Sequence, residues 1–175
     1  AGGVLPVIKH MPGLGRAMID SHHQLPVIDE PLDVLRENDL APFQQLRESP
    51  WGMTAHMVCS AIDDKPATQS KAVIERLIRG DIGFEGVLFS DDLSMAALTG
   101  NLGERAALSL DAGCDVVEHC NGMLEEMQTV AAAVGPLSDG AQTRIIAAEA
   151  RRETAPEAVD RAALEARLSE LLAGG

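Results

Sequence analysis

The amino-acid sequence predicts an α/β fold in which parallel strands are joined by crossover helices. Short apolar or β-branched runs, typical of buried strands, alternate with longer segments whose apolar residues recur at helical spacing. Regular alternation of this kind favours a parallel sheet, because consecutive parallel strands need a long crossover connection. A chain of 175 residues with 46% hydrophobic content can bury a core, and no apolar run approaches the roughly 20 residues of a membrane span.

The strands and helices are expected in a simple order. Four runs are predicted as buried strands: Val4 to Ile8, Gly52 to Val58, Gly86 to Phe89 and Asp115 to Val117. Helical spacing covers the segments between them: Pro31 to Arg47, Ser70 to Arg79 and Leu102 to Ala112. Gly80 and Gly113 follow the last two segments, where glycine commonly ends a helix. Asn101 with Glu104 three residues later predicts a reciprocal N-cap.

The part of the chain after Gly122 differs, because its pattern predicts helices and no further strand. The expected helices are Met123 to Val134, Gln142 to Arg152 and Pro156 to Leu172. The last has an apolar stripe made of Val159, Ala163, Leu164, Leu168 and Leu171. We interpret residues 136–175 as packing helices of the domain whose sheet lies in residues 1–135.

Charge and cysteine content exclude some classes of protein. A net charge of −13 argues against electrostatic binding to nucleic acid or to an anionic membrane, so neither is expected as a partner. Cys59, Cys114 and Cys120 lie in apolar runs without a CxxC pattern, which indicates buried thiols and a reducing, cytoplasmic location. No signal peptide is recognisable, although a chain that starts with Ala1 suggests that the sequence continues upstream.

Polar residues follow every predicted strand. They are Lys9 and His10 after the first, His56 late in the second, Ser90, Asp91 and Asp92 after the third, and Glu118, His119 and Asn121 after the fourth. The carboxyl ends of parallel strands meet at one edge of the sheet, where α/β proteins build their sites. We therefore expect the functional site at this edge.

The loop after the first strand carries an Asp-x-His pair, Asp20 and His22. An aspartate that accepts from one ring nitrogen fixes the histidine tautomer and leaves the other nitrogen free for proton transfer. Two other interpretations remain open from spacing alone: a surface turn with solvated histidines, or a metal site made of Asp20, His22 and His23. The pair Asp91 and Asp92 is similarly ambiguous, because such carboxylates can cap a helix, bind a divalent ion or supply a nucleophile.

Four motifs remove much of this ambiguity. They are KHMPGLGRAMIDSHHQLPVID, TAHMVCSAID, GFEGVLFSDDLSMAAL and ERAALSLDAGCDVV. In order and spacing these motifs resemble those of the bacterial family 3 glycoside hydrolases that act as β-N-acetylglucosaminidases in peptidoglycan recycling. The resemblance, which covers roughly residues 6–134, implies that Asp91 is the nucleophile and that His22 with Asp20 is the acid/base dyad. It also implies that Lys9 and His10 contact the substrate sugar.

The resemblance carries further expectations about fold and reaction. It implies a (β/α)8 barrel, of which residues 1–135 would form the carboxyl-terminal half with the last four βα units, and an amino-terminal half-barrel as missing partner. The implied reaction is retaining hydrolysis of a terminal, nonreducing β-linked N-acetylglucosamine from muropeptides that carry a 1,6-anhydro-N-acetylmuramoyl unit, without metal or cofactor. One Trp, three Phe and no Tyr also favour a short pocket for one sugar over a long groove.

Two departures from the family pattern leave an alternative open. Leu14 stands where the family usually has histidine in its PGHG loop, so any contact of that histidine is lost. Four strands cannot close a barrel, and the family's upstream substrate-binding residues lie outside this sequence. The alternative is an incomplete, catalytically incompetent half-barrel that self-associates and serves as a sugar-binding or structural module.

Overall fold

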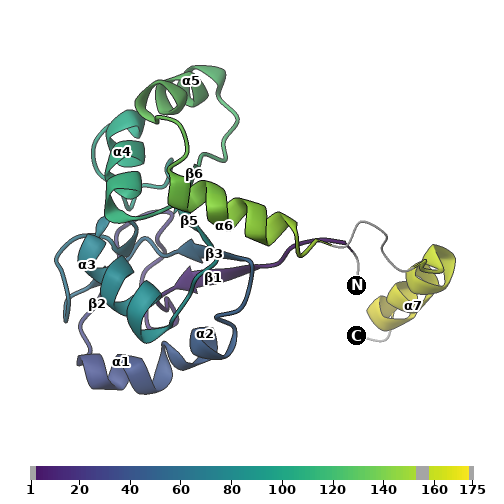
Figure 1. Ribbon diagram of the computed structural model, residues 1–175. Helices are drawn as coiled ribbons and strands as arrows, with labels where there is room; N and C mark the ends of the chain where they lie inside the picture. Colours follow the sequence, from purple (N-terminus) through teal and green to yellow (C-terminus); the bar gives the residue numbers. More distant parts are fainter. Residues whose placement is uncertain (1–2, 153–157, 174–175) are drawn as a thin grey trace.

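The structure is a computed structural model that describes residues 3–152 and 158–173. A sheet of four parallel strands has the order β1-β3-β5-β6 (Figure 1), with the bounds Val7–Met11, Trp51–Thr54, Val87–Asp92 and Val116–Glu118. In register, Val7 pairs with Trp51, Trp51 with Val87, and Phe89 with Val116. The predicted α/β fold with a parallel sheet is therefore confirmed.

Two strand predictions were wrong in their bounds. The run Gly52 to Val58 is not one strand, because β3 ends at Thr54 and a separate short strand, β4 (Val58–Cys59), pairs with β2 (Val27–Ile28). Residues 52–59 are all buried, including the polar Thr54 and His56, so no exposed residue marks the break. The first strand begins at Val7 and runs on to Met11, which places Lys9 and His10 inside it.

The helices after β2 pack on one face of the sheet. They are α1 (Leu32–Asn38), α2 (Ala41–Gln45), the 3-10 turn η1 (Ala67–Gln69), α3 (Lys71–Val73) and the π-helical segment η2 (Ile74–Asp81). The single helix predicted over Pro31 to Arg47 is interrupted at Asp39 and Leu40. Pro42 lies in the first turn of α2, where its missing N–H costs nothing, whereas inside a continuous helix it would remove a hydrogen bond.

The main hydrophobic core lies between these helices and the sheet. Its largest fully buried members are Met11, Leu40, Met57, Ile74, Leu77, Ile78, Ile82, Phe84 and Leu88. Gly52 on β3 permits this packing, because a Cβ there would lie 2.3 Å from Cε of Met11 and 2.8 Å from the ring of Phe84. On the opposite face of the sheet, Trp51 and Phe89 are only partly buried, with ring centroids 5.3 Å apart.

The remaining helices follow the prediction closely. The reciprocal N-cap of Asn101 and Glu104 opens α4 (Leu102–Ala112), and Gly113 ends it with a φ of 117°. α5 (Leu124–Ala133) packs against α4, and α6 (Asp139–Glu149) begins three residues earlier than predicted because Ser138 caps it.

The last helix, α7 (Arg161–Ala173), buries no side chain, and Figure 1 draws it apart from the sheet. Leu164 and Leu168 of its apolar stripe are 58% and 57% exposed. The predicted start of this helix at Pro156 lies outside the described residues. None of the helices in the described ranges is both long and apolar enough to cross a membrane.

Candidate active site

A cavity of about 370 Å³ lies at the carboxyl ends of β1 and β5. All five residues singled out from the sequence line it: Lys9, His10, Asp20, His22 and Asp91. Four larger cavities of the described part of the chain, of about 560, 450, 430 and 400 Å³, lie elsewhere and contain none of these five residues. The polar side chains predicted at the strand ends therefore do form one cluster.

His22 and Asp20 form a hydrogen-bonded dyad on the loop after β1. Asp20 Oδ1 accepts from Nδ1 of His22 at 2.7 Å and from the backbone N–H of His22 at 2.9 Å. The hydrogen bond from Asp20 raises the pKa of the His22 imidazole, and the two His22 donors lower the pKa of the Asp20 carboxyl. Nδ1 is thereby occupied as a donor, and Nε2 is left for proton transfer.

The loop that carries the dyad is anchored at two points. Arg16 donates from Nε to both carboxylate oxygens of Asp39, at 2.8 and 3.0 Å. The backbone N–H of Ala96, in the loop after β5, donates to the carbonyl of His22 at 3.4 Å. Between these anchors Met18 is 94% exposed, so this part of the loop lies at the surface, on the solvent side of the pocket. Leu14, the departure from the family pattern, lines the same pocket.

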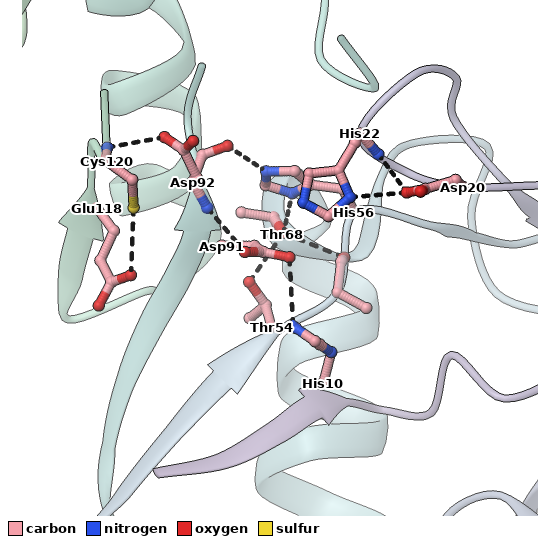
Figure 2. Close-up of polar contacts among 11 residues, drawn as sticks. His10, Asp20, His22, Thr54, His56, Thr68, Asp91, Asp92, Glu118 and Cys120 are labelled. Carbon is pink, nitrogen blue, oxygen red and sulfur yellow. Dashed lines mark hydrogen bonds and ion pairs between the residues drawn. The ribbon is translucent and has the colours of Figure 1, made fainter. Parts of the chain in front are cut away.

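Asp91 lies at the end of β5 and faces the pocket. Its side chain is 13% exposed, and its Oδ2 lies 3.6 Å from Nε2 of His10 (Figure 2). Its Oδ1 accepts from the backbone N–H of Asp92 at 2.9 Å. Burial lowers the pKa of His10, helped by Lys9 and His22 and opposed by Asp91. One carboxylate oxygen of Asp91 is thus fixed while the other faces His10 and the pocket.

Asp92 has a different environment from its neighbour. Its carboxylate accepts from Ser94 N at 3.0 Å, from Ser94 Oγ at 2.5 Å and from Cys120 N at 3.1 Å. Burial raises the pKa of this carboxyl, but the hydrogen bonds from Ser94 and Cys120 outweigh it and the pKa lies below its usual value. Asp92 therefore stabilises the turn after β5; it does not cap a helix, because the next helix begins at Leu102 with Asn101 as its N-cap.

The remaining polar strand ends divide into two groups. Glu118, on β6, lies near Asp91, and burial together with the negative charge of Asp91 raises the pKa of its carboxyl. His119 and Asn121 instead face α5: Nε2 of His119 lies 3.2 Å from Glu126, and the Asn121 amide donates to the same carboxylate. The sequence placed Glu118 among the polar residues at this edge but gave it no role. It gave no signal for Thr68, a buried residue hydrogen-bonded to His56, because Thr68 lies outside the four family motifs.

Two further interpretations can be compared with the structure. Across the described residues, no three His, Cys, Asp or Glu side chains lie so as to hold a metal ion, so the geometry does not support a metal site at Asp20, His22 and His23. Cys59 and Cys114 are buried as expected. The expectation of a buried thiol was wrong for Cys120, which is exposed because it follows the last strand of the sheet.

Comparison with known proteins gives a consistent result. The family model described as "Glycosyl hydrolase family 3 N terminal domain" matches residues 1–153. A β-hexosaminidase of Chromobacterium violaceum is 42% identical over 139 residues, which are 77% of this chain and 39% of that protein. A β-hexosaminidase of Neisseria gonorrhoeae is 44% identical over 124 residues, 69% of this chain and 34% of that protein.

Solved structures of similar proteins agree in fold. A family 3 β-N-acetylglucosaminidase from Paenibacillus sp. superposes with a TM-score of 0.75 at 33% identity, over 91% of this chain and 34% of that one. NagZ from Neisseria gonorrhoeae, in complex with N-trifluoroacetyl-D-glucosamine, gives a TM-score of 0.72 at 35% identity, over 95% and 46%. The chain spans less than two fifths of the length of the two β-hexosaminidases above.

Proposed function

This chain belongs to glycosyl hydrolase family 3, and we propose that it is the catalytic, carboxyl-terminal half of a retaining exo-β-N-acetylglucosaminidase. The observation that carries the proposal is the shared pocket of Asp91 and the Asp20–His22 dyad. A carboxylate nucleophile and a histidine with one free ring nitrogen are the two groups that such a reaction needs.

In the proposed first step, Asp91 attacks the anomeric carbon of the bound sugar. Protonated His22 gives its Nε2 proton to the leaving oxygen as the glycosidic bond breaks, and a glycosyl ester on Asp91 results. The raised pKa of His22 favours the protonated form that this step requires. Asp20 remains ionised and stabilises the imidazolium.

In the second step the roles of His22 reverse. Neutral Nε2 accepts a proton from water, the water oxygen attacks the anomeric carbon, and the ester bond to Asp91 breaks. The sugar leaves with its original anomeric configuration. Lys9 and His10, which line the same pocket, bind the sugar hydroxyls in both steps.

The proposed substrate is a terminal, nonreducing β-linked N-acetylglucosamine on a muropeptide. The N-trifluoroacetyl-D-glucosamine bound to the Neisseria gonorrhoeae relative supports this sugar class. A pocket of about 370 Å³ is of the size for one sugar unit and not for a long saccharide. A cytoplasmic location stays a prediction.

The proposal includes a second half of the barrel. Residues 1–135 would supply four βα units, residues 136–175 would supply the helices that follow them, and an amino-terminal half would pair with the edge strands β1 and β6. The length of the relatives, of which this chain matches 39% and 34%, supports this arrangement. In the alternative, the chain would act as a noncatalytic module.

The first test is the coding sequence upstream of Ala1. We expect the reading frame to continue into four further βα units, and an in-frame stop codon followed by a start signal for this chain would contradict the half-barrel. The protein that includes the upstream part is called the extended protein below. Release of nitrophenol from a nitrophenyl N-acetyl-β-glucosaminide is then compared between the extended protein and the 175-residue chain.

The nucleophile is tested in the extended protein by Asp91→Ala. We expect activity to fall by a factor of at least about 10⁴, since no covalent ester can form. Asp111→Ala, at an exposed position of α4, is the matched control and should keep full activity. Unchanged activity in Asp91→Ala would overturn the assignment, and an inactive extended protein would favour the noncatalytic module.

A further inference from the structure

His56 is a fully buried histidine that the proposed mechanism does not use. It follows β3, and its exposed fraction is 0%. Both of its ring nitrogens are nevertheless hydrogen-bonded: Nδ1 lies 2.8 Å from Oγ1 of Thr68, and Nε2 lies 3.0 Å from the backbone carbonyl of Asp92 (Figure 2). A polar side chain held so completely inside the protein requires an explanation.

The partner of Nε2 determines the tautomer. A backbone carbonyl only accepts hydrogen bonds, so Nε2 must carry a proton and donate it to Asp92. Burial lowers the pKa of His56, which keeps the ring neutral and leaves Nδ1 as an acceptor. Thr68 therefore donates its hydroxyl proton to Nδ1.

A second threonine completes the chain of hydrogen bonds. Thr54 Oγ1 lies 2.8 Å from Thr68 Oγ1 and donates to it, since the proton of Thr68 is already used. The carbonyl of Ala55 also lies near Thr68, at the longer distance of 3.1 Å. Thr54, Thr68 and His56 all have an exposed fraction of 0%, so water does not compete for these hydrogen bonds.

The chain of hydrogen bonds ends on the backbone that carries Asp91. The N–H of Asp92 donates to Oδ1 of Asp91 at 2.9 Å, and the carbonyl of the same residue is the acceptor for His56. Both peptide units of Asp92 are thus fixed, one to the Asp91 carboxylate and one to the buried ring. Any rotation of these units would move the carboxylate relative to His10, which lies 3.6 Å from its other oxygen.

We propose that His56 is a positioning residue that holds the carboxylate of Asp91 in the attacking geometry through the backbone of Asp92, and that Thr68 and Thr54 fix its tautomer. This inference rests on the proposed function of Asp91. His56 touches neither the sugar nor the reacting atoms, so its effect falls on the rate of ester formation and not on sugar binding. A misplacement of about 1 Å can cost about 100-fold in rate.

The test compares His56→Phe with His56→Gln in the extended protein. Phenylalanine fills the space but offers no donor to Asp92, whereas the amide of glutamine restores a donor in place of Nε2. For His56→Phe we expect kcat to fall about 100-fold while KM changes less than about threefold, and for His56→Gln we expect most of kcat to return. The formation rate of the glycosyl ester, measured by mass spectrometry with a 5-fluoro glycosyl fluoride, should fall in parallel.

Thr68 provides a test that does not alter the ring itself. Thr68→Val keeps the shape but cannot donate to Nδ1, and Thr68→Ser keeps the hydroxyl. We expect Thr68→Val to lower kcat about tenfold, with Thr68→Ser close to wild type. This pair decides the question if His56→Phe does not fold.

The outcomes separate this inference from the proposed function. If Asp91→Ala is inactive while His56→Phe and Thr68→Val keep the wild-type kcat, the positioning role is wrong and the nucleophile stands. A rise in KM without loss of kcat would also overturn it, because His56 would then act on binding. If Asp91→Ala keeps full activity, the nucleophile assignment itself fails.

Discussion

Asp20 Oδ1 accepts two hydrogen bonds from a single residue, His22, at 2.7 Å from the ring and 2.9 Å from the backbone. The backbone bond fixes the aspartate beside the ring, and the ring bond fixes the tautomer. Both side chains are largely exposed, at 59% and 70%, so the loop geometry and not burial creates the pair. The dyad therefore depends on the local backbone conformation, because its two residues are only two positions apart in the sequence.

The first prediction concerns the pH dependence of activity in Asp20→Asn. Asp20 raises the pKa of His22, so the protonated acid persists to higher pH in the wild type. An amide carries no charge, and the pKa of His22 should fall towards its ordinary value. We expect the alkaline limb of kcat/KM in the extended protein to move to lower pH. Asp33→Asn, at an exposed position of α1, is the control, and an unmoved limb in Asp20→Asn would contradict the dyad.

The second prediction concerns the leaving group in His22→Ala. Only a poor leaving group needs a proton, so loss of the acid should lower kcat/KM for an alkyl N-acetylglucosaminide by about 10² to 10⁴. A nitrophenyl substrate, whose leaving group is already a stable anion, should lose far less. The neighbouring His23→Ala is the matched control, because the His23 side chain is exposed and forms no hydrogen bond with Asp20 or His22 in the described structure. Equal losses on both substrates would argue against proton donation by His22.

The sequence predicted the place of the site better than its internal contacts. Lys9, His10 and Asp91 could be grouped in advance because the ends of parallel strands meet at one edge. The pairing of Asp20 with His22 could not be separated from a surface turn by spacing alone. The role of His56 depends on Thr68, a residue 12 positions away in another segment, which no local pattern reveals.

The errors in the fold have equally specific causes. All residues from Gly52 to Cys59 are buried, including the polar Thr54 and His56, so no alternation of buried and exposed residues marks the end of β3. The segment Pro31 to Arg47 is not one helix because Pro42 is favoured in the first turn of a second helix and not in a helix interior. The capping signals of α4 were correct at both ends, Asn101 with Glu104 and Gly113. Gly80 was wrong as a helix end, because it lies inside η2, which continues to Asp81.

The third prediction tests the close packing at Gly52. An alanine Cβ at this position would meet Met11 and the ring of Phe84 at distances that require both side chains to move. We expect Gly52→Ala to lower the free energy of unfolding of the extended protein by about 1–3 kcal/mol in urea titration. At Gly135 nothing lies within 4 Å of the added Cβ, so Gly135→Ala should stay within about 0.5 kcal/mol of wild type. If the two variants are equally stable, the core around β3 is looser than the structure indicates.

The last prediction concerns Asp115, whose carboxylate joins three elements of the fold. It is 8% exposed and accepts from Leu88 N on β5 at 2.9 Å, from Arg79 on η2 at 3.0 Å and from Arg144 on α6 at 3.0 Å. Asp115→Ala would leave the largely buried Arg79 without its counter-charge. The expected loss in free energy of unfolding is about 3–5 kcal/mol.

The more exposed partner should matter less than the buried carboxylate. Arg144 is 32% exposed, so water can replace its contact, and Arg144→Ala should cost clearly less than Asp115→Ala. Asp111→Ala, on the exposed side of α4, is the control for removal of a carboxylate as such and should stay within about 0.5 kcal/mol of wild type. Because Asp115 lies at the amino end of β6, away from the pocket, kcat of a folded Asp115→Ala protein should be unchanged. A larger loss in Arg144→Ala than in Asp115→Ala would show that α6 is held mainly by other contacts of Arg144.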